Sequence, residues 1–170
     1  MTPEYVRELF DYDPETGALT WRVQRTNRVK VGMIAGRIEG KGYRQVNIDG
    51  KLYMGHRVVW FYVHGEWPDG EIDHINGDKL DNRIANLRVV TRGENLQNHR
   101  KPYKNNRSGF LGVCWHGAAR GWAAQIQVHG KNHRLGIFPT PELAHAAYLE
   151  AKARLHPCST ITQVAEEVPA

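Results

Sequence analysis

The alternation of hydrophobic and polar residues predicts short helices and strands in the first half of the chain. The dipeptide Thr2-Pro3 is typical of a helix start, and we expect that helix to stop at Asp13-Pro14. The segments 43–48 and 51–54 flank Asp49-Gly50, a dipeptide that favours a type I′ turn because both central residues need positive φ. This pattern predicts a β-hairpin.

A second group of elements follows the hairpin. The apolar run over residues 58–63 ends at Gly65, and it is more typical of a buried helix than of a half-exposed strand. Residues 71–74 and 87–91 are predicted as two strands that a polar loop separates. We expect a helix after the second of these strands.

The second half of the chain is predicted to form a three-stranded antiparallel sheet packed on one helix. The strands are expected over residues 110–115, 122–128 and 132–138, and the helix over 141–155. Because side chains alternate across a strand, one face of the sheet would be apolar and the other polar. The residues expected to face the helix are Ala124, Ile126, Val128, Leu135 and Ile137, and those expected to face away are Gln125, Gln127, Asn132 and Arg134.

Charge along the chain indicates a polyanionic partner. Of 170 residues, 23 are Lys or Arg and 18 are Asp or Glu, which gives a formal net charge of +5. Residues 16–38 and 101–140 contain basic side chains and no acid. Such stretches suit a phosphate backbone, because each neutralised phosphate releases condensed counterions. The residues expected to contact DNA are Arg25, Arg28 and Lys30 in the first stretch and Lys101, Lys104 and Arg107 in the second.

Other features argue against export and membrane insertion. The sequence has no apolar run of about 18 residues, and no basic segment followed by an apolar one at its N-terminus. Cys114 and Cys158 are too few for a disulfide framework or a four-cysteine zinc site. We therefore expect a cytoplasmic protein with no membrane partner and no small organic cofactor.

Residues 71–100 combine metal-binding and proton-accepting side chains. Asp73 and His74 adjoin at the end of a predicted strand, Asn86 lies in the connecting segment, and Asn95 lies on the following helix. Consecutive strand residues face opposite sides, so Asp73 and His74 can flank one phosphate only if the strand ends or bends there. Asn98 and His99 are expected on the same side of that helix as Asn95.

These residue types suit hydrolysis of a phosphodiester. The carboxylate of Asp73 and the amide oxygen of Asn95 are hard ligands for magnesium or manganese. A neutral imidazole at His74 would accept a proton from an attacking water. His99 is an alternative or additional ligand. The plainer interpretation is a capped turn, since Asp, Asn and Gly form turns through local hydrogen bonds.

The motif resembles the HNH, or ββα-metal, endonucleases of the homing type. The resemblance implies that His74 is the general base, that Asp73 and Asn95 bind the metal, and that Asn86 holds the histidine-bearing hairpin. Asn95 stands where many members carry His. Magnesium-using members also carry Asn at this position, so the resemblance argues against a zinc site. The matching positions are Asp73-His74-Ile75-Asn76-Gly77-Asp78, Asp81-Asn82-Arg83, Asn86-Leu87-Arg88, Thr91 and Asn95.

Residues 108–156 resemble the APETALA-two/ethylene-response-factor DNA-binding domain, whose sheet enters the major groove. The polar face expected above carries residue types that read bases, Gln and Asn for adenine and Arg for guanine. Leu111, Cys114 and Gln127 stand where plant members place arginines, so a plant-like target sequence is not implied. The matching positions are Ser108-Gly109, Gly112-Val113, Trp122-Ala123-Ala124, Ile126, Leu135-Gly136, Phe138, Ala144 and Ala147-Tyr148.

The whole sequence predicts an α+β protein with two domains. A ββα-metal nuclease core with an N-terminal β-hairpin region would precede a small three-stranded antiparallel sheet packed on one helix. The expected parts are a nuclease domain over 1–100 with its core motif at 71–100, a basic linker at 101–107, a DNA-binding domain at 108–156 and a tail at 157–170.

The predicted function is a metal-dependent endonuclease that nicks double-stranded DNA. Its setting would be the cytoplasm of a bacterial or phage-infected cell, and we expect a monomer, with a dimer as the alternative. Two other functions stay open. One is a sequence-specific DNA-binding regulator with an inactive nuclease motif, and the other is a nuclease that acts on RNA.

Overall fold

The computed structural model describes residues 1–102 and 104–159, which fall into two compact units. The first unit is Met1–Thr91 and the second begins at Arg92. This division comes before the boundary that we expected after residue 100. Most of the predicted tail, 157–170, lies outside the described residues. The mixture of helices and small antiparallel sheets confirms the α+β class.

The first unit begins with a short helix and a two-stranded sheet. Helix α1 (Pro3–Leu9) starts as predicted, and the Thr2 hydroxyl accepts a hydrogen bond from the Tyr5 amide at 3.3 Å. The helix ends earlier than we expected, because strand β1 (Phe10–Tyr12) pairs antiparallel with β2 (Leu19–Trp21). The predicted extension to Asp13-Pro14 was therefore wrong.

A three-stranded sheet and a buried helix follow, of which the hydrophobic pattern predicted the helix and two of the three strands. Strands β3 (Arg37–Ile38), β4 (Arg44–Ile48) and β5 (Lys51–Met54) lie in the order β3-β4-β5. Asp49 and Gly50 have φ values of 50° and 83°, which confirms the hairpin turn. Helix α2 (Gly55–His64) ends where Gly65 adopts a φ of 80°, a left-handed C-cap.

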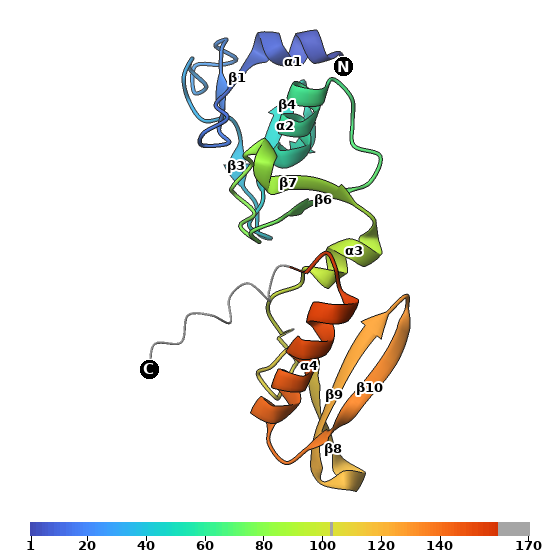
Figure 1. The fold of residues 1–170 in the computed structure, drawn as a ribbon. Coiled ribbons are helices and arrows are strands. Elements are labelled where there is room, and N and C mark those ends of the chain that lie inside the picture. Colours follow the sequence, from blue (N-terminus) through green and yellow to red (C-terminus); the bar gives the residue numbers. More distant parts are fainter. Residues whose placement is uncertain (103, 160–170) are drawn as a thin grey trace. The chain divides into compact units, whose positions relative to one another are not determined.

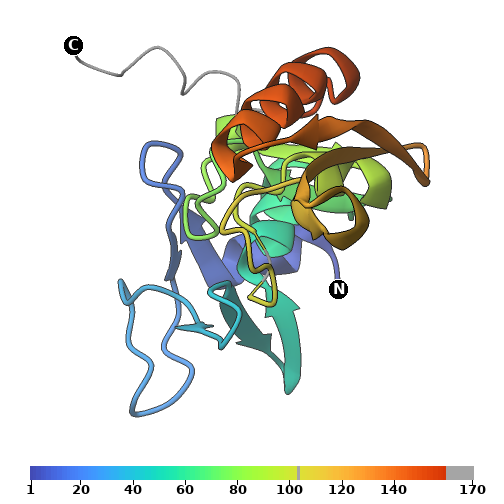
Figure 2. The same ribbon diagram turned by 90° about the horizontal axis from the view of Figure 1, so that it is seen from below.

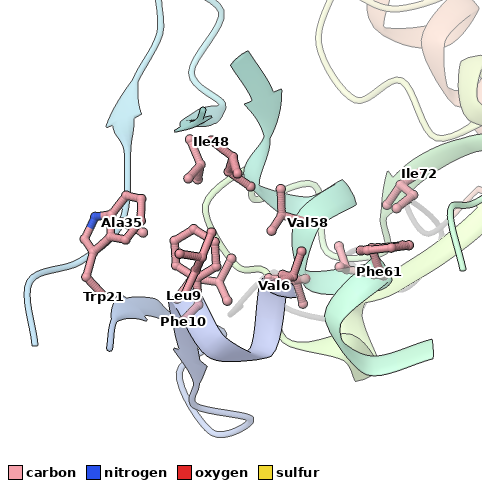
Figure 3. Close-up of a cluster of buried hydrophobic side chains, with 13 residues drawn as sticks. Val6, Leu9, Phe10, Trp21, Ala35, Ile48, Val58, Phe61 and Ile72 are labelled. Carbon is pink, nitrogen blue, oxygen red and sulfur yellow. The ribbon is translucent and has the colours of Figure 1, made fainter. Parts of the chain in front are cut away.

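The core of the first unit gathers side chains from these elements and from one further hairpin (Figure 3). Val6 of α1, Phe10 of β1 and Val58 of α2 are almost completely buried there. The further hairpin pairs β6 (Glu71–His74) with β7 (Leu87–Val90), and a short 3₁₀ helix, η1 (Ile84–Asn86), precedes β7. Ile72 and Leu87 attach this hairpin to the core.

The second unit contains helix α3 (Arg92–Gln97) and the predicted sheet and helix (Figure 1). Strands β8 (Val113–His116), β9 (Gly121–Val128) and β10 (Lys131–Phe138) form an antiparallel sheet in the order β10-β9-β8, with the short 3₁₀ helix η2 (Gly117–Ala119) between β8 and β9. Helix α4 (Pro141–Leu155) packs on this sheet through Ala144, Tyr148 and Ala151. Across the residues that the structure describes, no helix has the length and apolar character of a membrane span.

One residue of this sheet faces the wrong way relative to the prediction. Ile137 is 41% exposed, whereas Leu135 and Phe138 pack against the small core. The pairing of β10 with β9 shifts between Arg134 and Gly136, which breaks the strict alternation. A bulge has no clear signal in the hydrophobic pattern, so the expectation that Ile137 faces α4 was wrong.

Candidate active site

The β6–β7 hairpin brings the two leading candidate residues to the end of a strand. Asp73 lies opposite Arg88 and His74 lies opposite Leu87 in the antiparallel register. The Ile75 amide donates to the Asn86 carbonyl at 2.9 Å, and the Gly77 amide donates to the His74 carbonyl at 2.8 Å. The chain therefore turns directly after His74, which is the condition that we set for Asp73 and His74 to flank one phosphate.

Asp73 is buried, and its charge is balanced across the hairpin. Its side chain is paired with Arg88, whose Nε and Nη2 both donate to Asp73 Oδ2, at 2.9 and 2.7 Å. Two donors from one guanidinium fix the orientation of the carboxylate as well as compensating its charge. This pair follows from the register of the hairpin, which places residues 73 and 88 opposite each other, and we had not predicted it from the sequence.

His74 is buried on the other side of the hairpin. Its Nε2 lies 3.1 Å from Asn82 Oδ1, and both side chains are buried. Since an amide oxygen only accepts, His74 Nε2 is placed to donate to this oxygen. Asn82 belongs to the matching motif, but we had predicted no role for it.

The loop that carries Asn82 is held by hydrogen bonds to Tyr12 and by close packing against Gly17. The Tyr12 hydroxyl accepts from the Ile84 amide at 2.9 Å and donates to the Asn82 carbonyl at 3.3 Å. Gly17 has a φ of +72°, and a Cβ there would lie 2.5 Å from the Asn82 carbonyl carbon. Residues of the β1–β2 hairpin thus hold the loop that carries Asn82 in place.

Asn86 ties the two ends of this loop together. Its Oδ1 accepts from the Asn76 amide at 2.9 Å, and its Nδ2 donates to the Asp81 carbonyl at 2.8 Å. Asp81 also binds Arg83, and this hydrogen bond is the main reason that its pKa is lowered to about 2. These two bonds connect both parts of the loop, and the role that the family resemblance implies for Asn86 stays a prediction.

Two further aromatic rings surround His74. The His56 ring lies edge-on to it with centroids 5.2 Å apart, and the Tyr43 ring lies 6.0 Å away. Burial, followed by the charges of His74 and Arg57, lowers the pKa of His56 to about 4. His56 is therefore neutral at pH 7 and does not add a positive charge beside His74.

Comparison with known proteins identifies the family. Residues 53–97 match the model of the HNH endonucleases. Protein 3.8 of Escherichia phage T7 is 37% identical over 94 residues, which are 55% of this chain and 74% of that protein. The chain belongs to the HNH endonuclease family.

Other similarities are partial. An uncharacterized HNH endonuclease of Acanthamoeba polyphaga mimivirus is 29% identical over 111 residues, which are 64% of this chain and 56% of that protein. A solved structure, described as DNA binding and cleavage by the HNH homing endonuclease I-HmuI, has 20% identity and a TM-score of 0.39. That alignment covers 79% of this chain and 74% of the other. At the level of the family, the prediction of a DNA endonuclease is confirmed.

The third motif residue of this HNH endonuclease lies in the second unit. Asn95 is on α3, which ends at Gln97, so Asn98 and His99 lie beyond the helix and the expected shared helical side was wrong for both. His99 Nε2 lies 2.9 Å from the Lys101 carbonyl oxygen. Within residues 1–102 and 104–159, no three His, Cys, Asp or Glu side chains are grouped as a metal site. The roles of Asn95 and His99 stay predictions.

The residues predicted to contact DNA are on exposed surfaces of their own units. On the sheet of the second unit, Arg134 pairs with Gln125 and Asn132 with Gln127, and all four are exposed. In the first unit, Arg25 forms an ion pair with Asp49. The remaining predicted contacts are also exposed: Arg28, Lys30, Lys101, Lys104 and Arg107.

Proposed function

We propose that this HNH endonuclease hydrolyses phosphodiester bonds of double-stranded DNA with His74 as the general base. The observation that carries the proposal is the position of His74, buried at the last residue of β6, next to Asp73 and bonded to Asn82. With its ring held by Asn82, His74 would accept the proton of the attacking water as the general base. The expected products carry 5′-phosphate and 3′-hydroxyl ends.

One divalent cation, magnesium or manganese, completes the proposal. The donor set fits such a cation, because Asp73 offers a carboxylate whose orientation Arg88 fixes, and Asn95 offers an amide oxygen. When bound, the cation would stabilise the charge that develops on the phosphate and the departing oxygen. Arg88 and the buried setting of Asp73 would hold the carboxylate ready for it.

The second unit is proposed as the part that positions the DNA. A three-stranded sheet on one helix is the architecture implied by the resemblance to the APETALA-two domain. Its exposed face presents amide and guanidinium groups side by side, which suits the edges of bases in a major groove. The basic segment with Lys101, Lys104 and Arg107 would contact phosphates.

Supercoiled plasmid with magnesium tests the proposal. The wild type should convert it to the nicked form, and chelation of the metal should stop the reaction. His74→Ala should abolish nicking and still retard DNA in a gel, because the basic surfaces are untouched. His64→Ala is the matched control, since His64 is an exposed histidine of α2 in the same unit, and it should nick at the wild-type rate.

The alternatives predict different results. Wild type that retards the plasmid and leaves it whole would favour a DNA-binding regulator, and cleavage of RNA alone would favour an RNA nuclease. One site cuts one strand at a time, so we propose a nicking monomer, with double-strand breaks only if two chains assemble. We further propose that it acts in the cytoplasm of a bacterial or phage-infected cell.

A further inference from the structure

The segment between β2 and β3 exposes apolar side chains beside basic ones. Residues 22–34 extend as a loop from the first unit (Figure 2). Val31 is 62% exposed, Ile34 is 55% exposed and Met33 is 48% exposed. Single exposed apolar residues are common, but three within four positions of one loop are typical of an interaction surface.

The loop is ordered by its own hydrogen bonds. At its base, the Trp21 amide donates to the Met33 carbonyl at 3.0 Å and the Gly32 amide donates to the Trp21 carbonyl at 2.8 Å. Near its tip, the Thr26 hydroxyl accepts from the Val29 amide at 3.2 Å. Trp21 is itself anchored on Phe10, with ring centroids 4.5 Å apart. The exposed side chains are thus presented on a folded support, which lowers the entropic cost of binding.

The charge around these side chains selects the kind of partner. From Thr16 to Ile38 the chain has no acid, and Arg28 and Lys30 are exposed on the loop. Two neighbouring basic residues are already compensated, because Arg22 pairs with Asp11 and Arg25 pairs with Asp49. A second copy of the same loop would bring Arg28 and Lys30 against like charges, so a self-contact is disfavoured.

We propose that this loop enters the DNA minor groove, with Arg28 and Lys30 on the phosphates and Val31 as an apolar wedge against the bases. The minor groove is about 6 Å wide, with phosphates along both edges and the stacked bases at its floor. Apolar side chains that enter it loosen a base step and bend the duplex. This inference rests on the proposed function, because it takes DNA as the partner.

A bending measurement tests the wedge. The probe is a random-sequence duplex of about 40 base pairs, labelled at its ends for energy transfer and saturated with protein. Wild type should bend it, and Val31→Ser should remove at least half of the change in transfer efficiency. Leu52→Ser is the matched control, because Leu52 is 56% exposed on β5 of the same unit, and it should bend DNA like the wild type. Neither change opens the core.

The basic residues have a separate readout. Replacing Arg28 and Lys30 by Ser should make the negative slope of log affinity against log salt shallower by about 2, because each lost phosphate contact removes about 0.9 from its magnitude. An unchanged slope would overturn the assignment of these two residues. At saturation the double variant should keep the bend, because Val31 is intact.

The outcomes separate this inference from the proposed function. Wild type that nicks plasmid but does not bend the duplex, or Val31→Ser that bends it fully, overturns the inference and leaves the nuclease standing. A Val31-dependent bend without nicking supports the inference and contradicts the proposed nuclease function. If sedimentation shows a wild-type dimer that Val31→Ser dissociates, the loop covers a second copy and the inference is wrong.

Discussion

Replacing Arg88 by Met should destabilise the β6–β7 hairpin, because it removes the guanidinium that donates two hydrogen bonds to the buried Asp73 carboxylate. Removal of one partner of a buried ion pair costs about 3–5 kcal/mol. The Asp73 side chain is 7% exposed and that of Arg88 is 27% exposed. Since water reaches part of the arginine, we expect the lower end of the range, about 3 kcal/mol.

A double-mutant cycle isolates the interaction between the two residues. It compares Arg88→Met, Asp73→Asn and the double variant by native-state hydrogen exchange of the amides in β6 and β7, which reports on this hairpin rather than on the whole chain. The double variant should be about 2 kcal/mol more stable than the sum of the single effects implies. The control is the exposed pair Arg22 and Asp11, where the coupling should be below about 1 kcal/mol.

Additive effects at Arg88 and Asp73 would refute this reasoning. They would mean that the carboxylate gains nothing from the guanidinium, and hence that Arg88 does not fix its orientation. Arg88→Lys refines the test, since Lys keeps the charge and loses the two-donor fork. A lysine variant with wild-type protection in β6 and β7 would show that charge alone is sufficient.

Two further predictions concern the surroundings of His74. Gly17→Ala should slow nicking at least tenfold, because the added Cβ would lie 2.4 Å from the Arg83 amide and displace the loop that carries Asn82. Gly50→Ala has a similar φ of +83° with nothing within 4 Å, and its nicking rate should stay near that of the wild type; equal losses would refute the packing argument. For His56, the pKa falls from an ordinary 6.5 to about 4 on folding, so the unfolded chain takes up a proton first as the pH drops. The contribution of neutral His56 to the free energy of unfolding should therefore be complete above pH 6.5, and this free energy should fall by up to about 3 kcal/mol between pH 6.5 and 4. Urea unfolding of wild type and His56→Gln should show this difference in pH dependence, and parallel profiles would contradict it.

Local signals in the sequence predicted the elements that local chemistry determines. Asp49-Gly50 forms the expected turn, and Gly65 ends α2 at the expected place. The predictions failed where pairing with another strand determines the local structure. Phe10 leaves the helical pattern because β2 pairs with it, and Ile137 turns outward because β10 has a bulge.

Within the site, the sequence predicted residue types better than their partners. Asp73 and His74 stand out as a pair, but the bond between His74 and Asn82 crosses a loop whose shape no periodicity encodes. That loop depends in turn on Tyr12, whose hydroxyl accepts a hydrogen bond from the Ile84 amide, 72 positions away in the sequence. Contacts of this range arise from the packed fold and cannot be derived from the order of residues in one motif.

The register of the hairpin determines how the proposed functional pair, Asp73 and His74, lies at the end of β6. Side chains alternate across a strand, so Ile72 and His74 share one face while Asp73 shares the other with Arg88. Ile72 and Leu87 attach the first face to the core, which explains why His74 is buried and its ring held by a fixed partner. In the proposed function, a phosphate that contacts both His74 and Asp73 would lie past the last residue of the strand. The strand stops at this point, because the turn from Ile75 to Gly77 is closed by the bond from the Gly77 amide to the His74 carbonyl.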